Sequence, residues 1–268
     1  MVKEKEARER RRLRPKPNAT PDDVAFGINP CAVAIEEGFA KRLLLVEERT
    51  NPRLQQLEEM ARARGMPVEF VPPERLDELT GGGVHQGALV RLRRLPETDL
   101  RTAAAPPGEG IVLLLDRVTD PQNVGAVLRT AVAVGARAVV LPKRRGATLT
   151  PGVHRASAGM SFLAPVTAPQ NLAQAVRRLQ ELDYWVVAAQ GGAGAEDATA
   201  FDWPARTALV VGSEGEGVSR LLLDLADFRV ALPMHPRVES LNVAVATGAL
   251  LYLWRRQWPF RSAEQEEG

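Results

Sequence analysis

Residues 110–131 read GIVLLLDRVTDPQNVGAVLRTA. The opening run, Gly110–Leu115, is continuously apolar, which is the pattern of a β-strand covered on both faces. Asp120 is suited to cap a following helix, Pro121 to begin it and Gly135 to end it. The segment therefore predicts a buried strand that leads directly into a helix.

The same alternation of strand and helix continues toward the C-terminus. Ala208–Gly212 is a second buried strand pattern, and Tyr184–Ala189 is a third. Helical patterns cover Gln170–Leu182 and Glu239–Gln257. Strands that alternate with helices predict an α/β domain with a parallel sheet covered on both faces.

A glycine-rich turn, GSEGEG at Gly212–Gly217, follows the second of these strands. Glycines without side chains let a ligand approach the backbone closely. No Gly-Lys-Ser/Thr follows, so the turn is not a phosphate-binding P-loop, and the dinucleotide spacing G-x-G-x-x-G is missing. By itself the turn is weak evidence for any function.

Residues 230–246 read VALPMHPRVESLNVAVA. The apolar run ends at Pro233, and Glu239, Ser240 and Asn242 then precede an apolar helical pattern. Ser240 is the predicted N-cap. Free N–H groups at a helix N-terminus are suited to hold a small polar ligand, although an ordinary capped helix would have the same pattern.

Together and in this order, the three segments resemble the SpoU-type 2′-O-ribose RNA methyltransferases of the SPOUT superfamily, over Gly110–Arg256. The matching elements are DPxNxGxxxR at Asp120–Arg129, GSEGxG at Gly212–Gly217 and LPM…ESLNV at Leu232–Val243. Arg155–Gly159 resembles a connecting segment of that family. Met160 and Ala244 depart from its usual residues, at positions to which no chemistry is assigned.

The resemblance implies a SPOUT parallel-sheet domain with a deep C-terminal trefoil knot. It also implies S-adenosyl-L-methionine as cofactor, held between the knotted loops, and a homodimer with active sites at the subunit interface. By matching motif positions, the cofactor-binding residues are expected to be Gly212, Leu232 and Leu241.

Arg129 matches the arginine of the first motif and is the leading catalytic candidate. The family assigns it the role of general base, but a guanidinium is a very weak acid and stays charged in proteins. Binding a phosphate and stabilising negative charge on the 2′-oxygen is the alternative role. The other candidates are Asn123, Glu214, Ser240 and Asn242, with Glu214 able to orient Arg129 or to bind the target.

Composition sets limits on the class of protein. The chain has 268 residues with 45% hydrophobic content, enough to bury one or two cores. Its formal net charge is only +2, so nucleic-acid contacts have to come from local basic patches. The single cysteine, Cys31, excludes a disulfide framework, indicates a reducing compartment and is expected to pack as a small hydrophobe.

No cluster of histidine, cysteine and carboxylate residues has the spacing of metal ligands, so no metal site is expected. No apolar run approaches the ~20 residues that span a bilayer, so no membrane is expected as a partner. The N-terminus is charged and unlike a signal sequence. These features predict a cytoplasmic protein.

The predicted domain order begins with a small α/β module that resembles the RNA-binding module of kink-turn ribosomal proteins. In bacterial 23S rRNA guanosine 2′-O-methyltransferases this module precedes the catalytic domain. Its Val84–Gly87 turn is the most specific local match, with His85 and Gln86 either satisfied within the turn or in contact with RNA. The predicted parts are a basic disordered tail (1–23), the RNA-binding domain (24–95), a linker (96–108), the methyltransferase domain (109–260) and an acidic tail (261–268).

The resemblance predicts 2′-O-methylation of a ribose, that of a guanosine, in 23S rRNA. Two alternatives keep the reaction and change the target, to another rRNA nucleotide as in thiostrepton-resistance methyltransferases or to tRNA. A third alternative is a catalytically silent RNA-binding factor in ribosome assembly. The five catalytic candidates argue against a silent protein, because such a protein has no chemical need for them.

Overall fold

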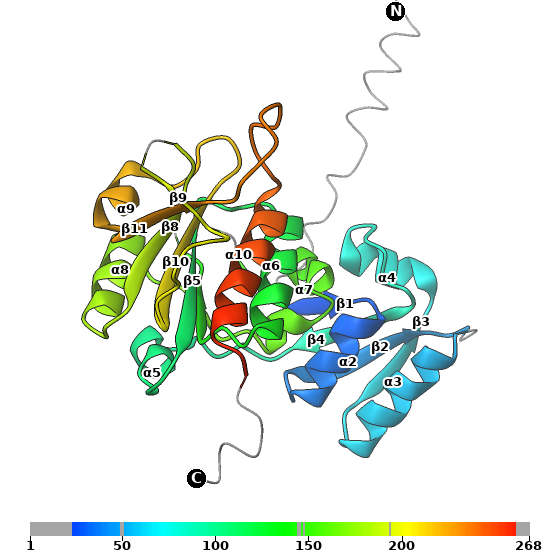
Figure 1. Ribbon diagram of the computed structural model, residues 1–268. Coiled ribbons are helices and arrows are strands. Elements are labelled where there is room, and N and C mark those ends of the chain that lie inside the picture. Colours follow the sequence, from blue (N-terminus) through cyan, green and yellow to red (C-terminus); the bar gives the residue numbers. More distant parts are fainter. Residues whose placement is uncertain (1–22, 49–50, 144–145, 147, 193, 261–268) are drawn as a thin grey trace, which may run out of the picture. The chain divides into compact units, whose positions relative to one another are not determined.

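The chain divides into two units, Met1–Arg94 and Leu95–Gly268. The computed structural model describes residues 23–48, 51–143, 146, 148–192 and 194–260 (Figure 1). The predicted acidic tail and all of the predicted basic tail except Asp23 lie outside the described residues.

The first unit contains a four-stranded sheet in the order β1-β4-β2-β3. Strand β4 is antiparallel to β1 and β2, whereas β3 is parallel to β2. The strands alternate with helices, as predicted. Their bounds are Val24–Phe26 (β1), Ala40–Val46 (β2), Val68–Val71 (β3) and Ala88–Leu92 (β4), and those of the helices are Ile28–Glu36 (α2), Pro52–Ala63 (α3) and Pro73–Thr80 (α4).

Local sequence signals delimit helix α3 in this unit. Asn51 caps α3 by accepting a hydrogen bond from the backbone N–H of Arg53, and Gly65 follows the helix with a φ of 65°. Cys31 on α2 is fully buried, which confirms its expected packing, and burial raises the pKa of its thiol. The thiol is therefore an inert part of the core.

The turn at Val84–Gly87 is satisfied within the unit. Gln86 Oε1 accepts a hydrogen bond from the backbone N–H of Ile28 at 3.0 Å, at the first turn of α2. His85 accepts one from the N–H of Gly87 at 3.0 Å and lies 3.2 Å from an Asp77 oxygen. Of the two alternatives left open by the sequence, these bonds favour the structural one.

The second unit contains a seven-stranded sheet in the order β7-β6-β5-β10-β8-β11-β9. Every pairing between neighbouring strands is parallel, which confirms the predicted α/β domain with a parallel sheet. The strands are Gly110–Asp116 (β5), Ala138–Val140 (β6), Val166–Thr167 (β7), Trp185–Ala189 (β8), Glu196–Asp197 (β9), Arg206–Gly212 (β10) and Phe228–Ala231 (β11).

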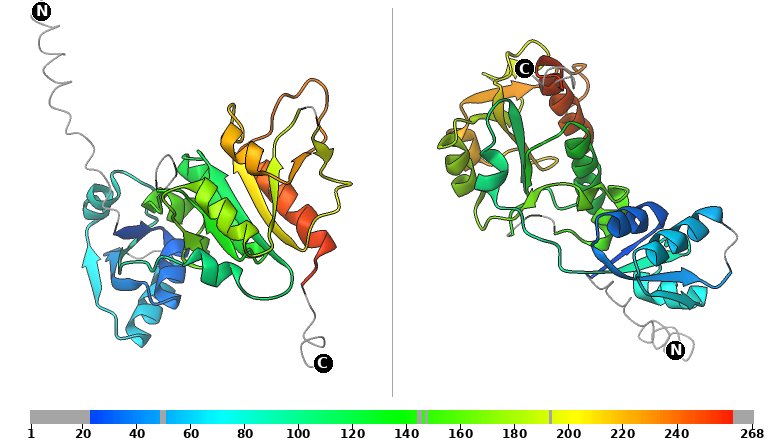
Figure 2. Two further views of the ribbon diagram at one scale, coloured as in Figure 1. Left: turned by 90° about the vertical axis from the view of Figure 1, so that its left-hand side faces the viewer. Right: turned by 90° about the horizontal axis from the view of Figure 1, so that it is seen from below.

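Helices cover both faces of this sheet, with α5, α8 and α9 on one side and α6, α7 and α10 on the other (Figures 1 and 2). Two separate apolar cores result, one on each face. Strand β5, in the interior of the sheet, contributes alternate residues to them and is buried along its whole length. The helices are Leu100–Ala104 (α5), Pro121–Ala133 (α6), Pro151–Ala156 (α7), Leu172–Gln180 (α8), Arg220–Leu225 (α9) and Val243–Gln257 (α10), with a 3₁₀ turn at Met160–Phe162 (η1).

The segment predicted to be an irregular linker, 96–108, contains helix α5. Leu100 and Ala104 of this helix are buried in the core that α8 also contributes to. The guanidinium of Arg137 donates to the carbonyl oxygens of Pro107 and Glu109 at 2.7 and 2.6 Å. The prediction was wrong here because two apolar residues, too few to show a period, are enough for a helix that packs on a preformed surface.

Helix α6 confirms the signals in residues 110–131. Asp120 is its N-cap, Pro121 its first residue, and Gly135 follows its end with a φ of 66°. Gly125 lies where α6 meets α7, since a β-carbon there would come within 2.4 Å of the Ala156 β-carbon. This motif glycine is therefore explained by helix packing.

A buried polar cluster lies behind this contact. The Nδ1 atom of His154 lies 2.8 Å from Ser161 Oγ, and Ser157 Oγ lies 3.0 Å from the same oxygen. The imidazole stacks on Phe162, and its Nε2 atom has no hydrogen-bond partner among the described residues. Burial lowers the pKa of His154 to about 4, so the ring is neutral at pH 7.

Candidate active site

The three sequence motifs meet at one edge of the second sheet. Strands β5, β10 and β11 are parallel, so their carboxyl ends, at Asp116, Gly212 and Ala231, lie on the same side. Helices α6 and α10 pack against each other and begin at this edge. In open α/β sheets this edge is where ligands bind.

The glycine-rich turn folds back on its own base. A β-carbon on Gly212 would lie 2.0 Å from the carbonyl group of Gly217, so the first glycine is required by the chain itself. The turn is closed by a hydrogen bond from the Gly217 N–H to the Ser213 carbonyl at 3.0 Å. At its tip, Gly215 has a φ of 86° and no atom within 4 Å of its β-carbon position.

Asn123, Glu214 and Asn242, one from each motif, lie together. The side-chain amide of Asn242 donates to Glu214 Oε1 and to Asn123 Oδ1, each at 2.8 Å. Glu214 Oε1 also accepts the backbone N–H of Val243 at 3.1 Å, at the start of α10. A carboxylate at this position is stabilised by the helix N-terminus.

Asn242 is the N-cap of α10, and the prediction that Ser240 caps this helix was wrong. Asn242 Oδ1 accepts hydrogen bonds from the N–H groups of Ala244 and Val245 at 3.0 and 3.3 Å, so α10 begins at Val243 and not at residue 239. With its two donated bonds, all four hydrogen-bonding positions of the Asn242 side chain are filled. Asn242 therefore organises the site from within the chain.

Arg129 lies on the exposed surface of α6 and has no hydrogen bond or ion pair among the described residues. It does not contact Glu214, so the expected orientation of Arg129 by Glu214 is absent from the described part of the chain. Arg129 follows Asn123 by six residues, which corresponds to about 240° around a helix, so the two side chains leave α6 in different directions. Its guanidinium is available to a ligand.

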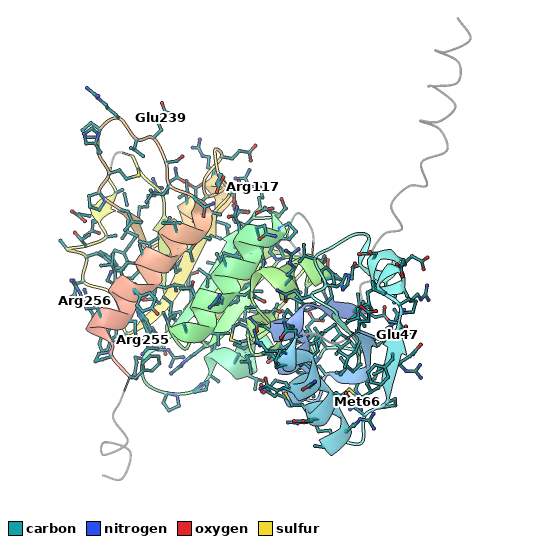
Figure 3. All side chains as sticks on the ribbon, turned by 90° about the vertical axis from the view of Figure 1, so that its right-hand side faces the viewer. Glu47, Met66, Arg117, Glu239, Arg255 and Arg256 are labelled. Atoms are coloured by element: carbon teal, nitrogen blue, oxygen red, sulfur yellow. The ribbon has the colours of Figure 1, made fainter. Side chains whose placement is uncertain are left out.

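The loop from Leu232 to Asn242 projects from the domain between β11 and α10 (Figures 1 and 3), with Glu239 on its outer part. Ser240, on the same loop, is exposed and has no hydrogen bond to another described residue. Three apolar side chains of this loop are exposed to solvent: Met234, Val238 and Leu241. Apolar side chains gathered on an exposed loop are typical of a surface that a ligand or partner covers.

The three expected cofactor residues occupy this same edge. Gly212 ends β10, Leu232 directly follows β11, and Leu241 lies two residues before α10. Leu241 is exposed, whereas Leu232 is half-buried against the core. Aliphatic side chains beside bent backbone are suitable surroundings for an adenine ring, which has apolar faces and polar edges. The residues present thus fit a nucleoside-containing cofactor.

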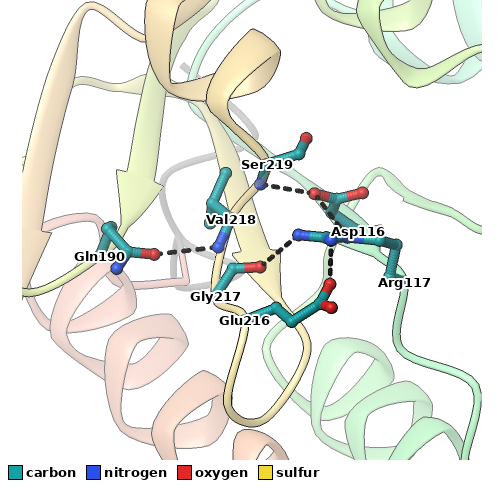
Figure 4. A network of polar contacts seen from close by, with 7 residues as sticks. All are labelled: Asp116, Arg117, Gln190, Glu216, Gly217, Val218 and Ser219. Carbon is teal, nitrogen blue, oxygen red and sulfur yellow. Dashed lines mark hydrogen bonds and ion pairs between the residues drawn. The ribbon is translucent and has the colours of Figure 1, made fainter.

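A second polar network at this edge was not predicted (Figure 4). The carboxylate of Asp116 accepts the N–H of Ser219 at 2.8 Å, and Gln190 Oε1 accepts the N–H of Val218 at 2.9 Å. Arg117 contacts Glu216 and the carbonyl oxygen of Gly217. These residues are 28 to 103 positions apart in sequence, so no local pattern indicates that they meet.

Among the described residues, no group of three or more histidine, cysteine, aspartate or glutamate side chains is arranged to hold a metal ion. Within that same part of the chain, no helix is long and apolar enough to cross a membrane.

A parallel α/β domain with a glycine-rich turn, a capped helix N-terminus and an exposed loop at one sheet edge belongs to the ligand-binding class of doubly wound folds. Residues 110–252 match the SpoU rRNA methylase family, and residues 24–97 match the family described as RNA 2′-O ribose methyltransferase substrate binding. The chain belongs to the SpoU rRNA methylase family, which confirms the resemblance seen in its sequence.

Individual relatives agree with this assignment. The chain is 39% identical over 239 residues to the 23S rRNA (guanosine-2′-O-)-methyltransferase RlmB of Xanthomonas campestris, covering 86% of this chain and 95% of the relative. It is 36% identical over 223 residues to the putative TrmH family tRNA/rRNA methyltransferase YacO of Bacillus subtilis, covering 81% and 89%. The AdoMet-bound rRNA methyltransferase from Sinorhizobium meliloti has a similar structure, with a TM-score of 0.72, 28% identity and 87% coverage of each chain.

Proposed function

We propose that this chain transfers a methyl group from S-adenosylmethionine to the ribose 2′-oxygen of a guanosine in 23S rRNA. The observation that carries the proposal is the convergence of Asn123, Glu214 and Asn242, one from each motif, at one edge of the sheet. The two other catalytic candidates, Arg129 and Ser240, have no hydrogen-bond partner in the described chain. The family, and the relative that is named a 23S rRNA guanosine methyltransferase, supply the substrate class.

S-adenosylmethionine supplies, when bound, an electrophilic methyl group for in-line displacement by oxygen. Gly212, Leu232 and Leu241 are the proposed cofactor residues, through backbone groups at the adenine edge and aliphatic contact with its faces. The exposed side chains of Met234 and Val238 extend the apolar surface beside Leu241. Backbone binding of this kind does not need a charged side chain in the pocket.

Arg129 is the residue proposed to act near the nucleophile, the ribose 2′-oxygen. Its exposed guanidinium binds an RNA phosphate and stabilises negative charge that develops on the 2′-oxygen, which requires no proton transfer by a strongly basic group. Ser240 accepts or donates a hydrogen bond to the ribose. Asn123 and Asn242 are positioning residues, because they hold the Glu214 carboxylate at the start of α10.

The Glu214 carboxylate has one oxygen engaged and one available. All of its hydrogen bonds within the described chain go to Oε1, from Asn242, from the N–H of Val243 and, at 3.5 Å, from Asn123. Oε2 is thus the proposed acceptor for a donor on the target nucleotide.

We further propose a homodimer with a trefoil-knotted C-terminal domain. Exposed residues Val245, Ala249 and Tyr252 form an apolar stripe along α10, with the side chains of Val245 and Tyr252 more than half exposed. This helix packs beside α6, which carries the exposed Arg129. A second copy that covers the stripe would bury it and complete a site around Arg129.

The first unit is the proposed RNA-binding module of the kink-turn ribosomal-protein type, with boundaries near residues 24 and 95. A cleft of about 540 Å³ on this unit is lined by Lys41, Arg42, Arg75 and Arg91, together with two carboxylates. Arg42 and Arg91 lie directly opposite each other on neighbouring strands, and each forms an ion pair with a carboxylate of the cleft, Arg42 with Glu69 and Arg91 with Asp23. The four cationic side chains of the cleft are the proposed contacts for RNA phosphates. The proposed location is the cytoplasm, where rRNA is available.

Labelled cofactor tests the reaction. Incubation of the protein with methyl-labelled S-adenosylmethionine and transcripts of 23S rRNA, 16S rRNA and tRNA, followed by nuclease mapping, is expected to place label on one guanosine 2′-oxygen in a loop of 23S rRNA. Label only in tRNA, or only on a base atom, contradicts the proposed substrate. Absence of both cofactor binding and methyl transfer to any RNA supports the alternative of a catalytically silent RNA-binding protein.

If the first unit binds RNA and the second binds cofactor, a fragment that begins at Leu95 should lose only the first of these functions. This fragment keeps α5 and is expected to bind cofactor, but to lose RNA affinity and to show a shallower salt dependence, since fewer counterions are released. A fragment that begins at Gly108 lacks α5 and is expected to melt at a lower temperature. Equal RNA affinity and equal salt slopes for fragment and full chain would show that the first unit has another task.

A further inference from the structure

Arg117, directly after β5, has a backbone conformation that its residue type disfavours. Its φ is 59°, in the left-handed region where glycine is unstrained and residues with a β-carbon are uncommon. Gly215 and Gly217, in the nearby turn, reach the same region as glycines. An arginine at such a position implies that its side chain makes contacts that offset the backbone cost.

Those contacts go to the glycine-rich turn and to Asp116, the last residue of β5. The guanidinium donates to the carbonyl oxygen of Gly217 at 3.2 Å and forms an ion pair with Glu216. Its Nε atom lies 3.7 Å from the buried carboxylate of Asp116. One side chain thus joins the end of β5 to the second half of the turn, residues 216–219, which is called the returning arm below (Figure 4).

Two further residues fix the same arm. Asp116 accepts the N–H of Ser219, and Gln190 accepts the N–H of Val218. Together with the Arg117 bond to Gly217, they hold three consecutive backbone positions, 217–219, from two different strand ends. The returning arm is therefore rigidly attached to the sheet.

The first half of the turn, residues 213–214, is the outgoing arm. It carries Glu214, whose carboxylate lies at the start of α10. Gly215 separates it from Glu216 and has no atom within 4 Å of its β-carbon position, so packing does not hold the tip. The position of Glu214 depends on the two arms, which are joined by the bond from Gly217 to Ser213. Anchoring the returning arm therefore constrains the carboxylate.

We propose that Arg117 is a positioning residue that acts through Glu216 and Gly217 to keep the Glu214 carboxylate at the N-terminus of α10. This inference rests on the proposed function for the catalytic consequence. The structural consequence, an ordered turn at residues 213–219, does not depend on the substrate. Arg117 itself contacts neither the cofactor residues nor the nucleophile's candidates among the described residues.

The test compares Arg117→Gly with Arg117→Lys in the full chain. Arg117→Gly relieves the left-handed backbone and removes the guanidinium, so the melting temperature is expected to stay within about 3 °C while kcat falls about ten- to hundred-fold. Amide hydrogen exchange in residues 213–219 is expected to accelerate. Arg117→Lys keeps the charge but not the two-pronged geometry, and is expected to recover part of both kcat and protection. Arg220→Ala, at an arginine whose side chain is 94% exposed, is the matched control.

Unchanged kcat and unchanged exchange in Arg117→Gly overturn the proposal. If that variant melts at a much lower temperature, Glu216→Gln decides, because Glu216 is exposed and its substitution leaves the fold intact. Faster exchange at 213–219 in Glu216→Gln supports the proposal, and wild-type exchange overturns it. If the wild-type chain methylates no RNA, the proposed function fails while the exchange measurement still tests the attachment of the turn.

Discussion

The polar groups of Asn242 and those of Arg129 and Ser240 lie in the same domain but differ in how they are satisfied. Asn242 uses all four of its hydrogen-bonding positions within the chain. Arg129 and Ser240 use none among the described residues. The motif residues therefore divide into a group that holds this region together and a group whose polar atoms remain available to a ligand.

The largest expected effect is on the unsatisfied group. Arg129→Ala should lower methyl transfer by roughly 10²- to 10³-fold, the usual effect of removing a group that stabilises developing charge. Because Arg129 has no partner in the described chain, the melting temperature and cofactor affinity should stay close to those of the parent. Single-turnover rates, calorimetry and cofactor titration measure the three quantities. Near-normal turnover would remove Arg129 from the catalytic assignment.

One interior polar group, His154, should make the stability of the fold depend on pH. The pKa of His154 is about 4 in the folded chain, below its ordinary value of 6.5, so the unfolded chain takes up the proton first. Its contribution to stability is complete above pH 6.5 and is lost as the pH falls from 6.5 to about 4, by on the order of 3 kcal/mol. Denaturant unfolding between pH 7 and 5 measures the slope, which His154→Asn should reduce. The same slope in that variant would assign the acid sensitivity to other groups, with His85→Asn and His235→Asn as controls.

A matched pair of loop variants separates the two groups directly. Asn242→Ala removes the N-cap of α10 and the amide that holds Glu214, so the free energy of unfolding should fall by roughly 2 kcal/mol, together with activity. Ser240→Ala, two residues earlier, should leave stability within about 0.5 kcal/mol and lower activity alone. Thermal unfolding and turnover are measured on both. Equal losses of stability in the two variants would contradict the division into residues satisfied within the chain and residues available to a ligand.

Much of the fold was predictable because its signals are local. Asp120, Pro121 and Gly135 delimit α6 through N–H and φ requirements that involve only their immediate neighbours. The continuous apolar run of β5 required cover on both faces, and this determined a parallel sheet with two cores. The three motifs also supplied the candidate residues, of which Asn123, Glu214 and Asn242 meet in the structure, since a spaced pattern of residue types is visible without a structure.

The amino-acid sequence by itself determined the main strands and helices of the second unit, its parallel sheet and the family of this protein, but not helix α5 or the start of α10. The tertiary structure alone decided that Asn242 rather than Ser240 caps α10, because Glu214 and Asn123 arrive from distant segments to hold it. It also decided the contacts of Arg117, whose left-handed backbone has no signature in sequence. Helix starts and buried strands depend on neighbours a few residues away in the sequence. Which polar groups are satisfied and which stay available depends instead on the strand ends, far apart in the sequence, that the sheet brings together.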